Sequence, residues 1–205
     1  TGKLAEAAAS FQRAISLRAD YVEPRFNLAA VLDRQGKLDG AAALYLEVLR
    51  LRPDYPRANN SMGIIRARQG RKTLAAEHFR QELTLDPGFA EAHNNLGQIL
   101  LELADNKGAE TRLREAIHVD PLNSKAHMNL GVALRRLGKP TAAAKQYLEA
   151  IRLDPRFVDA INNLGLLRMA EGKTAEAEAR FRSALQINPR FSPARANLER
   201  LLKQK

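Results

Sequence analysis

Hydrophobic positions along the chain recur with a period of 34 residues. One column of bulky aliphatic residues consists of Leu28, Met62, Leu96, Leu130, Leu164 and Leu198. No insertion or deletion separates any two of its members. Because a fixed period of this length is the signature of a repeat protein, we interpret the whole chain as copies of one short unit.

Within one period, the apolar residues have the spacing of two helices. Ala92, Leu96, Ile99, Leu100 and Leu103 lie at positions i, i+4, i+7, i+8 and i+11, which form a single stripe along a helix. A second stripe of the same kind follows in the same unit, at Ala109, Leu113, Ala116 and Ile117. Each period therefore predicts a hairpin of two packed helices.

Small residues and prolines mark the boundaries of these helices. Glycines that permit a left-handed turn lie between the two stripes, at Gly36, Gly70, Gly138 and Gly172. The third unit has Ala104 in this column, and there we expect the turn to be formed by Asp105, Asn106, Lys107 and Gly108. A second small column, where we expect the two backbones to come close, consists of Ala29, Gly63, Gly97, Gly131 and Gly165.

The period divides residues 1–205 into one solenoid domain. Five whole hairpins are predicted over residues 22–55, 56–89, 90–123, 124–157 and 158–191. Residues 1–21 are interpreted as the second helix of a truncated unit, because Gly2 stands in the turn-glycine column and Phe11 keeps the core pattern. We expect this open helix to associate with other chains. Residues 192–205 form a closing helix that turns polar toward its end.

The columns resemble the tetratricopeptide repeat family. Its signature is W-x2-L-G-x2-Y, then A-x3-F, then P, at a period of 34 residues, and the Leu, Gly, Ala, Phe and Pro parts match along the chain. The Trp column departs from the signature and holds Arg25, Asn59, His93, His127 and Ile161. The resemblance implies an all-α fold, a right-handed α-solenoid whose first helices line its concave groove.

Composition argues against several kinds of site. The chain has no cysteine, so it has neither disulfides nor a thiolate metal site, and we expect no metal and no cofactor. His93 and His127 lie one period apart without a cluster of further ligands, and a packing role is the simpler interpretation. No spacing brings a catalytic constellation together, so we do not expect an enzyme.

Two further classes of partner are disfavoured. The formal net charge is +10, but aromatic residues make up only 5% and form no stacking row, which argues against nucleic acid. No apolar run reaches the length of about 20 residues that a membrane span needs. The compartment is undetermined, and by default we expect a soluble, cytoplasmic protein.

Amides recur on the exposed stripe of the first helices. One column consists of Asn27, Ser61, Asn95, Asn129, Asn163 and Asn197, a flanking column adds Asn60, Asn94 and Asn162, and Gln98 shares the face of Asn95. A carboxamide both donates and accepts, so a row of them suits the backbone of an extended peptide. The repeats are similar to those of O-linked N-acetylglucosamine transferases, which implies such an asparagine ladder. The alternative is that these amides bind the adjacent repeat.

Arginines share another column of the same groove, at Arg34, Arg68 and Arg136. Residues 50–80 also hold eight Lys or Arg against two Asp or Glu. These charges favour a ligand with acidic groups, and the alternative is that they are only solvated surface charges.

The sequence therefore predicts a non-catalytic scaffold that binds an extended peptide or a helix of a partner protein in its groove. A substrate-recruiting arm of a larger enzyme, such as a glycosyltransferase, is the alternative. Self-assembly through the open N-terminal helix is a further alternative.

Overall fold

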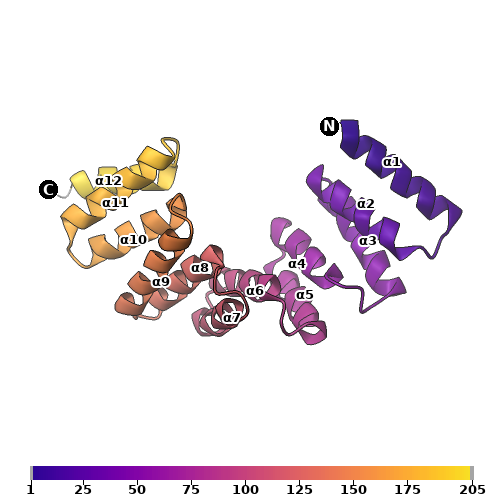
Figure 1. The fold of residues 1–205 in the computed structure, drawn as a ribbon, viewed down its shortest axis with the longest axis horizontal. Coiled ribbons are helices and arrows are strands. Elements are labelled where there is room, and N and C mark those ends of the chain that lie inside the picture. The colour runs from indigo at the N-terminus through magenta and orange to yellow at the C-terminus, as the bar shows by residue number, and fades with distance from the viewer. Residues whose placement is uncertain (1, 204–205) are drawn as a thin grey trace. The chain divides into compact units, whose positions relative to one another are not determined.

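The computed structural model describes residues 2–203, and every regular element among them is an α-helix (Figure 1). The chain divides into two compact units, the first ending at Ile99 and the second beginning at Leu100. The prediction of an all-α chain of helical hairpins is confirmed.

Each unit contains antiparallel helical hairpins together with single helices at its ends. The helices that begin in the first unit are α1 (Gly2–Leu17), α2 (Val22–Arg34), α3 (Leu38–Leu51), α4 (Ala58–Arg68), α5 (Lys72–Leu85) and α6 (Ala90–Glu102). The second unit contains α7 (Asn106–Val119), α8 (Ser124–Arg136), α9 (Pro140–Leu153), α10 (Val158–Ala170), α11 (Thr174–Ile187) and α12 (Ser192–Leu202). The even-numbered helices are the first helices of the hairpins, and the odd-numbered helices are the second helices.

Alanine and a large apolar side chain fill the centre of each hairpin. In the first unit, Ala75 and Phe79 of α5 are 0% and 1% exposed. In the second unit, Ala177 and Phe181 of α11 are both fully buried. Helix α1 differs, because its Phe11 is only half-buried and none of its residues is buried. The apolar face of α1 is therefore less covered than that of the later second helices.

Aromatic rings occupy the space beside three glycines of the small column, Gly63, Gly131 and Gly165. A Cβ on Gly131 would lie 2.5 Å from Cε1 of Tyr147, and one on Gly165 would lie 2.6 Å from Cε1 of Phe181. Carbon atoms normally stay about 3.5–4.0 Å apart. Glycine is thus required because the ring of the second helix occupies the space of a side chain on the first.

The turns between the helices follow one backbone pattern. The glycines of the turn column have φ between 72° and 76°, in the left-handed region. Ala104 adopts the same conformation with φ 62°, and the amide of Asp105 donates to the carbonyl of Leu100 as in a Schellman motif. The expected turn over residues 105–108 is therefore wrong. Helix α7 already begins at Asn106, and Asp105 caps it by accepting from the amide of Gly108.

Candidate functional site

Polar residues at four positions of the column that corresponds to the family's Trp bind the loop before a first helix. Arg25, His93, His127 and Arg195 each donate to the backbone carbonyl six residues earlier, at distances of 2.7, 2.9, 3.1 and 2.7 Å. These carbonyls belong to the loop that joins consecutive hairpins, where no helix supplies a donor. The two histidines therefore have a structural role. The sequence analysis assigned His93 and His127 a packing role, but it missed the N–H donors that recur in this column.

In the first unit, the amide columns link neighbouring first helices. Nδ2 of Asn95 on α6 donates to Oδ1 of Asn60 on α4 over 3.1 Å, and Nδ2 of Asn60 donates to Oε1 of Glu91 over 3.3 Å. Asn60 is only 4% exposed, whereas Asn95 is half-buried and Asn27 is exposed. The flanking column is thus turned toward the next hairpin.

The second unit repeats this linkage with the same offset. Nδ2 of Asn197 donates to Oδ1 of Asn162 over 2.9 Å, and Nδ2 of Asn163 contacts Sδ of Met128 at 3.6 Å. In each case the donor lies 35 residues after its partner. Asn129 and Asn162 are buried, as is Asn94 of the first unit, while Asn163 and Asn197 stay partly exposed. Asn163 and Asn197 therefore contact the preceding hairpin and remain partly accessible to solvent.

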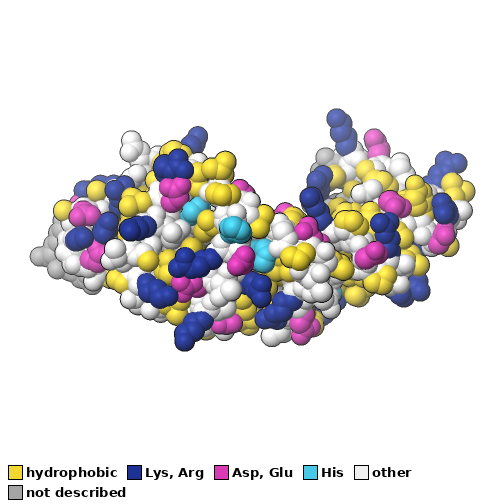
Figure 2. Space-filling model, turned by 60° about the horizontal axis from the view of Figure 1, so that its bottom comes forward, with side chains coloured by type: hydrophobic (Ala, Val, Ile, Leu, Met, Phe, Trp, Pro, Cys, Tyr) yellow, Lys and Arg dark blue, Asp and Glu magenta, His cyan; other side chains and the backbone are white. Residues whose placement is uncertain are grey.

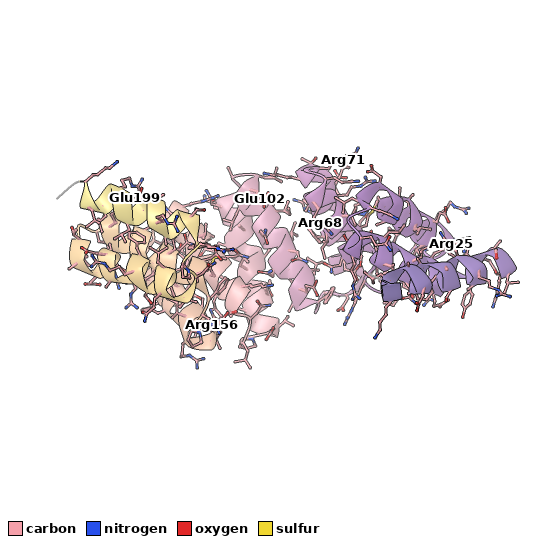
Figure 3. All side chains as sticks on the ribbon, turned by 90° about the horizontal axis from the view of Figure 1, so that it is seen from above. Arg25, Arg68, Arg71, Glu102, Arg156 and Glu199 are labelled. Carbon is pink, nitrogen blue, oxygen red and sulfur yellow. The ribbon has the colours of Figure 1, made fainter. Side chains whose placement is uncertain are left out.

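The arginine column bridges hairpins by the same offset. Arg68, at the end of α4 and labelled in Figure 3, forms an ion pair with Asp33 of α2. Nη1 of Arg136 donates to the backbone carbonyl of Leu101 over 2.6 Å, which satisfies an otherwise weakly bonded carbonyl in the last turn of α6. Arg34, Arg68 and Arg136 are all exposed. The guanidinium groups of Arg68 and Arg136 are therefore held by a neighbouring hairpin, although both residues stay exposed.

A small pocket brings three of the predicted groove residues together in the first unit. It lies between α4 and α6 and has a volume of about 190 Å³. Its lining consists of Ile64, Ala67, Arg68, Phe79, Asn95, Gln98 and Ile99. An apolar floor with an amide, a second amide and a cation at its edge has the chemistry to receive one side chain and the adjoining peptide group.

Glu82 of α5 caps the N-terminus of α4, one of the helices that line this pocket. Its carboxylate accepts from the backbone amides of Arg57, at 3.0 Å, and of Asn60, at 2.9 Å, and the residue is 2% exposed. These are the two amides that a capping box satisfies at a helix N-terminus, and no side chain of α4 itself caps that end. Glu82 replaces the small or aliphatic residues found at Val48, Ala116, Ala150 and Ala184. That replacement was a signal that the sequence interpretation missed.

Neither a metal centre nor a membrane helix is found in the described part of the chain. Residues 2–203 contain no group of three or more His, Asp or Glu side chains placed to hold a metal ion. None of the helices described is both long and apolar enough to cross a bilayer.

Stacked two-helix hairpins with polar, partly exposed first helices define the class of helical-repeat proteins. The model of the tetratricopeptide repeat family matches residues 1–56, 26–90, 60–110, 94–156 and 133–193. The chain therefore belongs to the tetratricopeptide repeat family, and it is consistent with a scaffold for protein interactions.

Solved structures share the fold. YrrB, described as a tetratricopeptide repeat protein with an unusual peptide-binding site, is 24% identical with a TM-score of 0.74, and the match covers 91% of this chain and 96% of that one. PilF of Pseudomonas aeruginosa is 22% identical with a TM-score of 0.78, covering 89% and 83%. The Cut9–Hcn1 structure reaches 0.83 at 20% identity, covering 98% of this chain and 40% of that one. At these identities the likeness concerns the fold alone. No curated protein matches the chain.

Proposed function

We propose that this protein is a non-catalytic scaffold that binds an extended peptide or helix of a partner protein along its first helices. The observation that carries the proposal is the pocket between α4 and α6, where Arg68, Asn95 and Gln98 converge on an apolar floor. A peptide side chain fills such a floor while its backbone meets the amides.

The hydrogen bonds between hairpins leave Asn95 able to bind a ligand. Its bond to Asn60 uses one of two N–H groups, and its Oδ1 accepts none of the hydrogen bonds found within residues 2–203. Gln98 is exposed at the pocket edge. The bridging and the peptide-binding interpretations of the amide column are thus compatible at this position.

Charge at the pocket favours an acidic ligand. Arg68 is exposed although it pairs with Asp33, and an exposed pair of this kind is worth only about 0–1 kcal/mol. A carboxylate on the ligand can therefore share or replace Asp33 at low cost. We expect selected peptides to carry Asp or Glu beside an aliphatic residue.

The test is a random peptide library selected on the protein, followed by calorimetric titration of the enriched peptides. Loss of one hydrogen bond from Gln98→Ala should weaken binding about fivefold, since such bonds contribute about 1 kcal/mol. Gln12→Ala, which removes an exposed glutamine from α1, is the matched control and should leave affinity unchanged. Selection of no peptide, or equal affinities for all three proteins, would refute the groove.

Self-association is a second candidate function, favoured by the half-buried Phe11 on α1. Sedimentation velocity of the wild type and of Phe11→Ser tests it. A concentration-dependent assembly that the substitution abolishes would support it, and a wild-type monomer at every concentration would reject it.

Recruitment of substrates for a larger enzyme makes the same prediction for the groove. It differs in requiring a catalytic domain elsewhere in the same polypeptide. The sequence of the complete gene distinguishes this alternative from a free-standing scaffold.

A further inference from the structure

Another pocket of the first unit lies between α3 and α5, which are second helices of their hairpins. Its volume is about 550 Å³, and its lining consists of Leu46, Leu49, Arg50, Pro53, Asn59, His78, Gln81, Thr84 and Leu85. Leu46 and Leu85 are 47% and 48% exposed, so apolar surface continues beyond the rim. Figure 2 shows hydrophobic side chains, in yellow, exposed over the first unit on the right of the view, with Lys and Arg between them.

The chain itself contains a contrasting version of this pocket. In the second unit, the corresponding space is lined by Arg114, His127 and Gln146 among others and measures about 280 Å³. By the 34-residue register, Arg114 stands where α3 has Leu46. Arginine also occupies this position at Arg80 and Arg182. The larger pocket therefore has a leucine where the smaller one has an arginine.

The charges around the larger pocket have one sign. Arg50 lies at its edge, exposed, and enters no ion pair among residues 2–203. Gln81 stands where other second helices have the acids Glu47, Glu115 and Glu149, so no carboxylate lines the space. An apolar cavity with an uncompensated cation at its edge is complementary to an aliphatic group beside a carboxylate.

We propose that this pocket docks an acidic amphipathic helix of a partner protein, with a Leu or Ile side chain in the cavity and a carboxylate on Arg50. A helix suits the space because the site is a groove between two helices and is flanked by exposed leucines on both walls. The pocket lies on α3 and α5, whereas the groove proposed above lies on α4 and α6. The two surfaces serve different segments of a partner, or different partners.

The test uses a synthetic helical peptide with leucines on one face and glutamates on the other, labelled for fluorescence anisotropy. Leu46→Arg, which installs the residue of Arg80 and Arg114, should weaken binding about tenfold or more, because it removes burial of an aliphatic side chain. Leu148→Arg is the matched control, since Leu148 has the same register and is 44% exposed. That control should bind like the wild type.

Two more variants and a second peptide separate the contribution of charge from that of apolar burial. Arg50→Gln should weaken the peptide about two- to fivefold, as an exposed ion pair contributes little. Gln12→Ala, at an exposed position of α1 outside both sites, should not change the affinity. A peptide with lysine in place of glutamate should bind markedly more weakly than the glutamate peptide.

Any one of the following four outcomes overturns the proposal. Equal binding of both peptides removes the role of Arg50. Equal effects of Leu46→Arg and Leu148→Arg remove the role of the pocket. Binding of octanoate, monitored by the methyl resonances of Leu46 and Leu85, without binding of the peptide assigns the pocket to a small aliphatic acid. Self-association abolished by Leu46→Arg assigns it to a second copy of this chain.

Discussion

Substitution of Glu82 tests whether α4, a helix of the proposed groove, depends on a cap supplied by another helix. Replacement of Glu82 by Ala removes a buried carboxylate that accepts from the amides of Arg57 and Asn60, at 3.0 and 2.9 Å. Both amides then lose their partner at the N-terminus of a helix, where the helix dipole also favours a negative charge.

The expected loss follows from these two bonds. A helix cap contributes about 1 kcal/mol, and a hydrogen bond to a charged group contributes about 1.5–3 kcal/mol. We expect Glu82→Ala to lower the free energy of unfolding by about 3 kcal/mol. Glu82→Gln keeps one acceptor oxygen and should lose about half as much. Glu77→Ala, at an exposed position of the same helix, should change it by less than about 0.5 kcal/mol.

Urea unfolding followed by circular dichroism measures the total, and amide hydrogen exchange measures where the loss occurs. Because repeats contact only their neighbours, the amides of α4 should exchange faster while those of α10 are unchanged. Unchanged protection of the Asn60 amide in Glu82→Ala would refute the capping role. So would a loss of stability no larger than that of Glu77→Ala.

Three further changes have defined outcomes. Ala104→Gly should raise the free energy of unfolding by about 1 kcal/mol and Gly138→Ala should lower it by about 1 kcal/mol, since both residues have positive φ; equal signs in urea titrations would contradict this. Gly131→Ala should lower the free energy of unfolding by about 1–3 kcal/mol, because its Cβ would overlap the ring of Tyr147. The higher helix propensity of alanine should offset about 1 kcal/mol of that loss. In the double variant with Tyr147→Leu, the cost of the overlap should disappear. Burial holds the pKa of His78 below its ordinary value, so below a pH of about 6.5 the unfolded chain binds a proton that the folded chain resists. Stability should therefore fall as the pH drops through that range, and His78→Gln should remove this component of the pH dependence in urea titrations at several pH values.

The contacts of each side chain could be predicted from the sequence only where they are local. The helices, the turn glycines and the buried stripe follow from spacing within one period, because a helix places residues three and four apart on one face. Ala104 shows the limit of such reasoning. It adopts a left-handed conformation although its side chain disfavours that conformation, and spacing alone does not indicate this.

The candidate site was predictable as a list of residues but not as a set of contacts. Asn95 and Gln98 were assigned to one face from their spacing, and the pocket between α4 and α6 contains both. That Asn95 donates to Asn60 depends on how one hairpin is offset against the next, and that Glu82 caps α4 depends on how the two helices of one hairpin pack. Such an offset is a property of packed surfaces, and no local pattern encodes it.

The amino-acid sequence by itself determined the repeat, the helices and the buried face of this protein, because hydrophobic periodicity within a helix is a local property. Tertiary structure alone decided which amides are consumed between hairpins and which stay open, and where Leu46 leaves a pocket. Those outcomes depend on distances between residues that are far apart in the chain, and these distances exist only once the helices have packed.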